Sequence, residues 1–271
     1  MQFTDSHFSL TGKVAIVTGA LGLIGKEHCR ALAHAGATVI ATDLDGEACI
    51  SFAETLPGKA MGYGADITNP DSVRSLRDFV LSECGTIDVL VNNAAINDKF
   101  ESPLAALEQS KFENYPLDQW QRSLNVNVTG TFLCSQILGT VMAEKGKGSI
   151  INVASTYGIV APNQDLYKDE SGNQRFYKTA SYPATKGAVI AFTKFLAAYW
   201  GEKGVRVNTL SPGGVENGQD EFFINNYSTR TPLKRMARAT DYQGAIVFLA
   251  SDASSYMSGA NLVVDGGFTA W

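Results

Sequence analysis

The stretch Val14-Ala-Ile-Val-Thr-Gly-Ala-Leu-Gly-Leu-Ile-Gly25 sets the fold class that we expect for this chain. Its β-branched run is typical of a buried strand, and the glycines after it allow a tight turn into a helix. The backbone N–H groups of such a turn, together with the helix N-terminus, can face a pyrophosphate. The alternative is a plain strand-to-helix turn. We predict a dinucleotide site with contacts from Gly19, Gly22, Leu23, Ile24 and Gly25.

Strand-like and helix-like segments alternate along the rest of the chain. Short β-branched runs lie at 14–18, 38–42, 87–91, 149–153, 206–210 and 262–264, and amphipathic stretches at 24–35, 70–83, 117–144, 185–201 and 240–250. This alternation predicts an α/β fold whose parallel sheet is covered by helices on both faces. The chain has 271 residues and no linker or internal repeat, so we expect one domain over 1–271.

Composition excludes several classes of protein. The net charge of −5 provides no basic field for a phosphate backbone, which argues against a nucleic-acid partner. The first residues lack a signal-peptide pattern, and we expect no run of about 18 apolar residues that could span a membrane. We therefore expect a cytoplasmic protein. No metal site is expected, because the three histidines lie near the N-terminus and the cysteines form no CxxC pair and read as reduced thiols: Cys29, Cys49, Cys84 and Cys134.

Asp43 ends the second predicted strand. A carboxylate at this place, with Leu44 beside it, can accept both ribose hydroxyls of an adenosine and would repel a 2′-phosphate. No Arg or Lys lies in the glycine turn or directly after Asp43, so we favour NAD over NADP. The alternative is an ordinary aspartate at the start of a loop.

Further polar residues follow the next strands. Asp66 and Ile67 lie in Gly-Ala-Asp-Ile-Thr, and Asn92-Asn93-Ala94-Ala95 follows the run at 87–91. Side-chain amides at a strand end can bond neighbouring backbone and shape the turn beside the adenosine. Turn chemistry alone is the alternative for either group.

Tyr182 and Lys186 are four residues apart in Ser-Tyr-Pro-Ala-Thr-Lys. On a helix this spacing places both side chains on one face, and a nearby cation favours the phenolate. The pair is suited to exchange a proton with a substrate. Taken alone, it could also be a chance spacing in a chain with 10 tyrosines.

Together these motifs resemble the short-chain dehydrogenase/reductase family, and the resemblance covers the chain nearly end to end. The residues that carry it are Thr18–Gly25, Asp66, Asn92–Ala95, Asn127, Ser155, Tyr182, Lys186, Ser211–Gly213 and the Val-Val-Asp-Gly-Gly at 263–267. The resemblance implies a single Rossmann-like domain with a doubly wound parallel sheet, present as a homodimer or homotetramer. It also implies hydride transfer between a nicotinamide and an alcohol or carbonyl.

The resemblance assigns roles to four residues. Tyr182 would exchange the proton with the substrate oxygen, Lys186 would bind the nicotinamide ribose and lower the phenol pKa, and Ser155 would hold the reacting oxygen. Asn127 would anchor a water that links Lys186 to solvent. Backbone near the nicotinamide carboxamide would come from Pro212, Gly213, Val215 and Asn217.

The chain departs from the family pattern at the glycine turn. Leu23 stands where the middle glycine is usual, and Gly22 lies one position earlier. This Thr-Gly-x-x-Gly-x-x-Gly spacing resembles nucleotide-sugar epimerases and dehydratases, but the chain is too short for their substrate domain. Smaller departures are Ala95 in place of Gly and Asn217 in place of Thr.

Two long polar connections, 97–116 and 156–181, follow strands, and 216–238 is the expected substrate cover. The second connection makes the Ser155–Tyr182 separation about twice the family's usual value. We expect its polar residues near the mouth of the site: Tyr157, Asp165, Tyr167, Lys168, Arg175 and Tyr177. Arg230, Lys234, Arg235 and Arg238 in the cover favour a hydroxyl-rich or anionic ligand, unless they face water or a neighbouring subunit.

The leading hypothesis is an NAD-dependent oxidoreductase that acts on a secondary alcohol or ketone of a small, polar, sugar-like molecule. A sugar, a sugar phosphate or a polyol would fit. One alternative is an epimerase or dehydratase that retains its NAD, and another is a non-catalytic NAD-binding regulator. The intact set of Asn127, Ser155, Tyr182 and Lys186 argues against the regulator.

Overall fold

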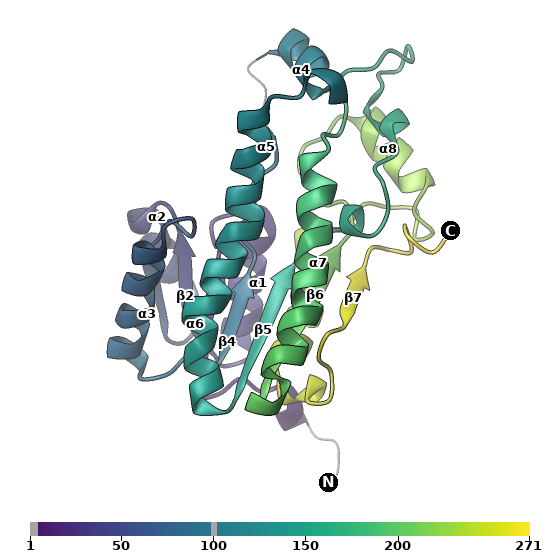
Figure 1. Cartoon of the computed structure of the whole chain (residues 1–271). Helices are drawn as coiled ribbons and strands as arrows, with labels where there is room; N and C mark the ends of the chain where they lie inside the picture. Colours follow the sequence, from purple (N-terminus) through teal and green to yellow (C-terminus); the bar gives the residue numbers. More distant parts are fainter. Residues whose placement is uncertain (1–4, 99–101) are drawn as a thin grey trace.

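A seven-stranded parallel sheet in the order β3-β2-β1-β4-β5-β6-β7 forms the centre of the molecule (Figure 1). The computed structural model describes residues 5–98 and 102–271. The strands are β1 (Val14–Thr18), β2 (Thr38–Asp43), β3 (Ala60–Gly64), β4 (Val89–Asn92), β5 (Gly148–Val153), β6 (Val205–Pro212) and β7 (Asn261–Val264). All six predicted strands are confirmed within two residues at each end. The predicted Rossmann-like α/β fold is confirmed.

The edge strand β3 was not predicted from the sequence. Its residues, Ala-Met-Gly-Tyr-Gly, include no β-branched side chain and two glycines, which have low strand propensity. It forms because β2 pairs with it in parallel, from Val39 opposite Ala60 to Asp43 opposite Gly64. Pairing with an existing strand therefore compensates for weak local propensity.

Burial on both faces explains why most strands of the sheet could be predicted from the sequence. Every residue of β1 is buried, with Ala15 and Val17 in one hydrophobic cluster and Val14 and Ile16 in the other. A strand covered on both faces is apolar throughout and does not alternate with polar residues. The β-branched runs are the local signature of this three-layer arrangement.

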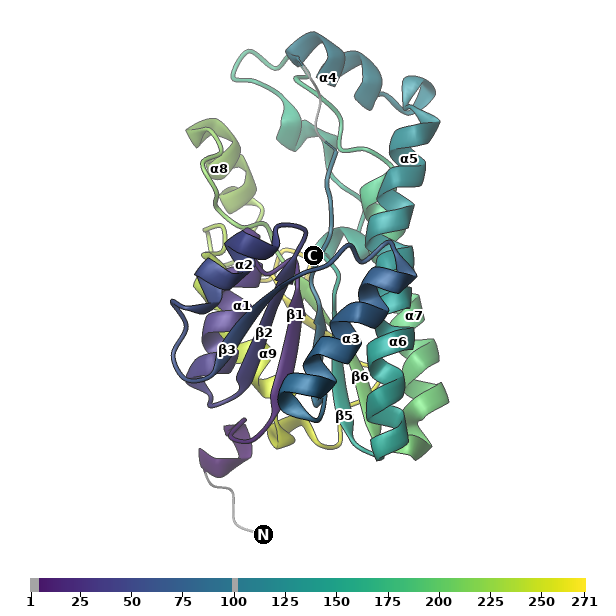
Figure 2. The same ribbon diagram turned by 90° about the vertical axis from the view of Figure 1, so that its left-hand side faces the viewer.

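Helices cover both faces of the sheet (Figure 2). The helices are α1 (Leu23–His34), α2 (Gly46–Ala53), α3 (Pro70–Cys84), α4 (Pro103–Ser110), α5 (Leu117–Leu124), α6 (Thr131–Lys145), α7 (Ser181–Trp200), α8 (Glu221–Thr229) and α9 (Gln243–Ala250). Residues of α1, α2 and α9 share one core cluster, and residues of α3, α6 and α7 share the other.

Three short helices lie where the sequence analysis predicted none. These are α2, α4 within the expected connection 97–116, and α8 within the expected cover 216–238. Each begins at a side-chain cap, because Asp45, Ser102 and Asp220 accept hydrogen bonds from backbone N–H groups of the first turn. These caps were visible in the sequence, but each helix has only eight or nine residues and gives a weak periodic signal.

The run from α5 to α6 bears on the expectation that no segment is apolar enough to span a membrane. The helical segment Leu117–Lys145 is long enough to cross a membrane and contains an 18-residue window apolar enough to do so, with a mean hydropathy of 1.3. Half of its apolar window is buried inside the protein, and Cys134, Leu138 and Met142 are fully buried against the sheet. It is therefore a core helix, and a core helix satisfies the same test.

The carboxyl ends of the strands form the upper edge of the sheet in Figures 1 and 2. The strand order reverses between β1 and β4, and ligands bind at this reversal in open α/β sheets. α4, α8 and the 156–181 connection all stand beyond this edge (Figure 1). The fold therefore gathers the glycine turn and both long connections around one place.

Candidate active site

In the turn after β1, backbone atoms pack closely against neighbouring backbone atoms. Gly19 has a φ of 64°, and a Cβ there would lie 2.6 Å from the Ala94 Cα. A Cβ on Gly25 would lie 2.1 Å from the Gly19 carbonyl oxygen, so both positions require glycine. The N-cap of α1 is Gly22, which has no side chain that could cap the helix. The N–H groups of its first turn therefore remain available to an anionic ligand, which fits a dinucleotide pyrophosphate.

Asn93 ties the turn after β1 to the end of β4. Its Nδ2 donates to the carbonyl oxygens of Thr18 (3.0 Å) and Gly19 (2.9 Å). In return, Thr18 Oγ1 accepts from the backbone N–H groups of Asn93 and Ala94, each at 3.1 Å. These four bonds hold the two sides of the topological reversal at a constant separation.

The two predicted carboxylates also bond local backbone. Asp43 accepts from the N–H groups of Leu21 (3.1 Å) and Leu44 (2.8 Å), one on each oxygen. Asp66 Oδ1 accepts from the backbone N–H and the hydroxyl of Thr68, at 2.8 and 2.7 Å. Each Asp43 oxygen keeps a second lone pair, and Asp66 keeps Oδ2, so these bonds leave acceptor capacity for ribose hydroxyls.

Helix α7 presents Tyr182 and Lys186 one turn apart. Lys186 is 4% exposed, its Nζ donates to the Val153 carbonyl oxygen at 2.8 Å, and it lies 5.7 Å from the centroid of the Tyr182 ring. Burial lowers the pKa of Lys186 to about 8, and the charge of Lys178 acts in the same direction. Burial raises the pKa of Tyr182, while a hydrogen bond with Ser155 lowers it.

Ser155 reaches Tyr182 although the long connection separates them in sequence. The residue lies two positions after the end of β5, and the single-turn helix Thr156–Gly158 packs against α7. Ser155 Oγ accepts from the Tyr157 N–H at 3.1 Å, which orients the hydroxyl. The connection therefore leaves the sheet edge after this contact and returns to it at the start of α7.

Asn127 lies in a π-helical turn, Asn125–Gly130, between α5 and α6. Its Oδ1 accepts from the Ile96 N–H at 2.8 Å, and its Nδ2 donates to the Ile96 carbonyl oxygen and to Thr185 Oγ1, at 3.0 and 3.2 Å. π-Helical turns are frequent at functional sites. At 2% exposure Asn127 lies behind the cavity wall, where it joins the segment after β4 to α7. Its water-anchoring role stays a prediction.

A cavity of about 950 Å³ connects these groups. Ser155, Tyr182 and Lys186 line it together with every other residue predicted to contact the cofactor: Gly19, Gly22, Leu23, Ile24, Gly25, Asp43, Leu44, Asp66, Ile67, Asn93, Ala94, Ala95, Pro212, Gly213, Val215 and Asn217. The fold thus brings together positions from six strand ends. Their roles toward a cofactor stay predictions.

The substrate end of the cavity differs from the expectation. Of the connection residues predicted at the mouth, Tyr157 and Tyr167 line the cavity, whereas Asp165, Lys168, Arg175 and Tyr177 do not. The cationic residues of the cover, Arg230, Lys234, Arg235 and Arg238, do not line it either. The sequence analysis missed the polar lining residues Asn97, Arg122, Lys178, Gln219 and Tyr227. Only Lys178 had a local signal, because it lies four residues before Tyr182.

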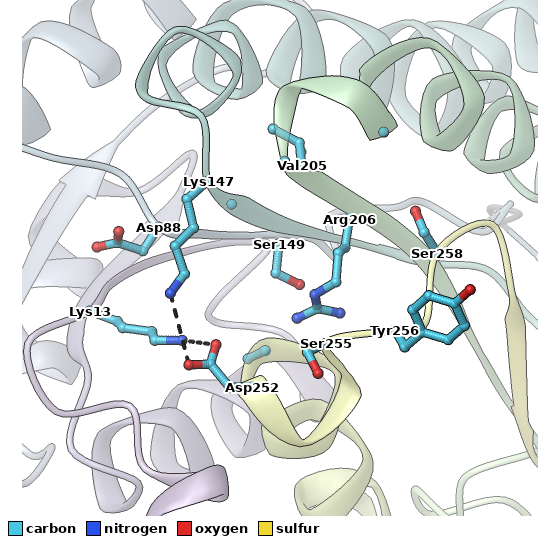
Figure 3. Close-up of a pocket in the computed structure, with 14 residues that line it drawn as sticks. Lys13, Asp88, Lys147, Ser149, Val205, Arg206, Asp252, Ser255, Tyr256 and Ser258 are labelled. Atoms are coloured by element: carbon cyan, nitrogen blue, oxygen red, sulfur yellow. Dashed lines mark hydrogen bonds and ion pairs between the residues drawn. The ribbon is translucent and has the colours of Figure 1, made fainter. Parts of the chain in front are cut away.

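A second cavity, of about 560 Å³, lies at the opposite edge of the sheet, where β1, β5 and β6 begin (Figure 3). Lys13 and Lys147 both approach Asp252, at 2.8 and 3.9 Å. Arg206 donates to the carbonyl oxygens of Leu249 and Ser251 and to the Ser254 hydroxyl. The cations of this cavity are engaged within the protein, so we place the active site at the carboxyl edge.

Comparisons with known proteins identify the family. A family model described as enoyl-(acyl carrier protein) reductase matches residues 19–269. D-threitol dehydrogenase from Mycolicibacterium smegmatis is 37% identical, over 98% of this chain and 96% of its own length. The 3-alpha-(or 20-beta)-hydroxysteroid dehydrogenase of Mycobacterium bovis is 35% identical, over 96% of this chain and 91% of its own.

A solved structure shares the whole fold. The crystal structure of a gluconate 5-dehydrogenase from Burkholderia cenocepacia, in complex with NADP and tartrate, superposes with a TM-score of 0.83. It is 31% identical and covers 98% of both chains. The chain therefore belongs to the short-chain dehydrogenase/reductase family of oxidoreductases.

Proposed function

We propose that this protein is an NAD(H)-dependent oxidoreductase that acts on a secondary alcohol or ketone of a small polyol- or sugar-like molecule. One observation carries the proposal: Ser155, Tyr182 and Lys186 line the same cavity as the glycine turn and Asp43. Nicotinamide-dependent oxidation of an alcohol requires a proton-exchanging group and a nucleotide-binding turn in one cavity.

A nicotinamide bound in this cavity would supply or accept the hydride. In reduction, the Tyr182 hydroxyl donates its proton to the substrate oxygen, and the Ser155 hydroxyl donates a hydrogen bond to the same atom. Lys186, fixed on the Val153 carbonyl oxygen at 2.8 Å, stabilises the phenolate that remains. Donors placed where negative charge develops stabilise the transition state. In oxidation the same groups act in reverse.

The preference for NAD rests on Asp43. Its carboxylate lines the cavity at the end of β2 and would repel a 2′-phosphate. Leu44, the next residue, is 74% exposed and carries no charge that could bind a phosphate. A relative has been solved with NADP, so cofactor choice must be measured for this chain.

The polar wall favours a hydroxyl-rich substrate. Asn97 and Gln219 line the cavity, as do Tyr157 and Tyr167, whose hydroxyl oxygens lie 3.1 Å apart. Burial raises the pKa of both phenols, so they remain neutral hydrogen-bonding groups. The substrates named for two relatives, threitol and gluconate, would match these polar side chains better than the hydroxysteroid named for a third relative.

A substrate panel followed by NADH absorbance tests the proposal. Polyols and sugar acids with NAD, and the matching ketoses with NADH, are assayed beside long apolar ketones, each also with the phosphorylated cofactor. We expect turnover of polar substrates with NAD(H). Rapid turnover of apolar ketones alone would contradict the substrate class, and preference for NADPH would contradict the role of Asp43. Conversion of a sugar without net use of cofactor would indicate an epimerase or dehydratase.

A further inference from the structure

Lys178 is a second lysine beside the candidate acid/base Tyr182. Its Nζ lies 4.2 Å from the centroid of the Tyr182 ring, closer than the 5.7 Å of Lys186, and its side chain lines the same cavity. It belongs to the 156–181 connection, three residues before α7 begins at Ser181. The long connection thus carries a cation into the site.

The backbone of Lys178 is fixed by Gln164. The Gln164 side chain accepts from the Lys178 N–H at 2.8 Å and donates to the Lys178 carbonyl oxygen at 3.0 Å. Gln174 Nε2 then donates to the backbone carbonyl oxygens of Gln164 (3.0 Å) and Phe176 (2.7 Å). Amide side chains of the connection itself therefore hold Lys178 in place.

The connection is anchored in turn to the substrate cover. Leu166 and Tyr167 are buried in one cluster with Tyr227 of α8 and Met236. The Tyr167 ring lies 5.8 Å from the ring of Phe223, also in α8. The position of Lys178 thus depends on a connection that is fixed by packed aromatic side chains. A side chain on such a segment is held more firmly than one on an exposed loop.

Burial lowers the pKa of Lys178 to about 8 and the charge of Asp98 acts in the opposite direction, but no carboxylate within residues 5–98 and 102–271 forms an ion pair with Lys178. Its Nζ donates to the neutral amide oxygen Asn97 Oδ1 at 2.8 Å. The nearby Asp98 accepts instead from hydroxyl groups, including those of Tyr115 (2.9 Å) and Ser123 (3.3 Å). An ammonium has three donors, so Lys178 retains capacity for a ligand.

We propose that Lys178 binds a carboxylate of the substrate, and that the enzyme therefore prefers a hydroxy acid over the neutral polyol of the same carbon skeleton. This rests on the proposed function and names its substrate class more closely. A carboxylate entering the cavity would meet both Lys178 and the charge of Lys186. Charge-assisted hydrogen bonds in a site that excludes water are stronger than neutral ones.

Lys168 provides a matched control for the test. It lies in the same connection and outside the cavity, and its Nζ pairs with Asp165 Oδ1 at 2.7 Å. Substitution by methionine removes the charge of either lysine while it keeps an unbranched side chain. Lys178→Arg, which retains the charge, is the conservative variant.

Turnover is measured with pairs that differ by one carboxylate: threitol and threonate, xylitol and xylonate, glucitol and gluconate. For at least one pair we expect the wild-type protein to favour the acid. Lys178→Met should lower kcat/KM for that acid by about 10- to 100-fold more than for the matching polyol, mainly through KM. Lys168→Met should change neither, and Lys178→Arg should restore part of the loss. An equal loss for acid and polyol in Lys178→Met would overturn the proposal.

Calorimetry separates this proposal from the proposed function. Each acid and its polyol are titrated into the NADH-saturated protein, so no turnover is needed. The carboxylate site is supported if an acid binds more tightly than its polyol and if this difference is lost in Lys178→Met and kept in Lys168→Met. This conclusion holds even if no substrate is oxidised. Absence of oxidation would contradict only the proposed activity. If no acid binds more tightly than its polyol, the role of Lys178 is refuted.

Discussion

At the scale of single residues, opposing influences act on the Tyr182 hydroxyl. Burial raises its pKa, Ser155 lowers it through a hydrogen bond, and Lys186 approaches from the next helical turn. A phenol that must both donate and accept a proton needs such opposing influences near neutral pH. The bound, positively charged nicotinamide would add a further influence that favours the phenolate.

Tyr182→Phe should lower kcat by about 100- to 10,000-fold, because the proton donor is lost while the ring remains. Binding of NADH, measured by its fluorescence, should change little. Tyr177→Phe is the control, since Tyr177 lies in the same connection but does not line the cavity. Unchanged turnover in Tyr182→Phe would favour the non-catalytic regulator.

The pH dependence should differ between the two directions of reaction. Alcohol oxidation needs the phenolate of Tyr182, so its kcat/KM should rise with pH, and carbonyl reduction should lose rate over the same range. Among the described residues, Lys178 and Lys186 are the cations that lie near the Tyr182 ring. In Lys186→Met the rise should move to higher pH, because one cation that favours the phenolate is removed. Superimposable pH profiles would show that Lys186 does not act on the phenol.

Asp43→Ser should shift cofactor use toward NADP. Removal of the carboxylate removes its repulsion of the 2′-phosphate, and we expect the NADP-to-NAD ratio of kcat/KM to rise by about 10-fold or more. Asp45→Ser is the matched control, because Asp45 caps α2 through the Ala48 N–H and serine also caps well. A ratio that changes equally in both variants would assign the effect to the loop as a whole.

At the scale of elements, α1 carries both the nucleotide turn and an unusual buried residue. His28 is 0% exposed, and neither ring nitrogen has a hydrogen-bond partner within the part of the chain that the structure describes. Burial lowers its pKa to about 4 from the ordinary value of 6.5. We therefore expect the helix that begins at the candidate cofactor site to lose stability in acid.

Between pH 6.5 and pH 4 the unfolded chain binds a proton at His28 and the folded chain does not. The free energy of unfolding should therefore fall as the pH is lowered, by about 2 kcal/mol from this residue at about pH 5. In urea titrations at about pH 7.5 and about pH 5, His28→Leu should reduce the difference by that amount. The exposed His34 at the end of α1 supplies the control, His34→Gln. An unchanged difference in His28→Leu would contradict this assignment.

At the scale of the whole molecule, α6 and α7 expose aromatic side chains on their outer sides. Phe132 is 43%, Phe195 63% and Tyr199 64% exposed, and the rings of Phe195 and Tyr199 stack at 5.8 Å. Apolar side chains gathered on a surface often mark a protein interface. They support the expectation, implied by the family resemblance, of a homodimer or homotetramer.

Phe195→Ser combined with Tyr199→Ser should lower the molar mass in light scattering at micromolar concentration. The reason is that an interface loses apolar area that its partner copy covers. Leu44→Ser, at another exposed apolar residue, is the control. A wild-type protein that is monomeric throughout would refute the oligomer.

The fold and the site differ in how far they could be predicted. Six of seven strands followed from local β-branched runs, because strands buried on both faces are apolar throughout. The strand β3 did not, since its pairing with β2 outweighs its weak propensity. Among the site residues, those that follow a strand directly were found, because parallel strands end at one edge of the sheet.

The sequence by itself therefore determined the parallel sheet, the glycine turn and the residue types at each strand end, all of which depend on local patterns. The tertiary structure alone decided which cations of the 156–181 connection and the 216–238 cover line the cavity. Lys178 does so, whereas Arg175 and Arg230 do not line it. The physical reason is that hydrogen bonds of Gln164 and aromatic packing against α8 guide the connection, and such distant contacts leave no periodic signal in sequence.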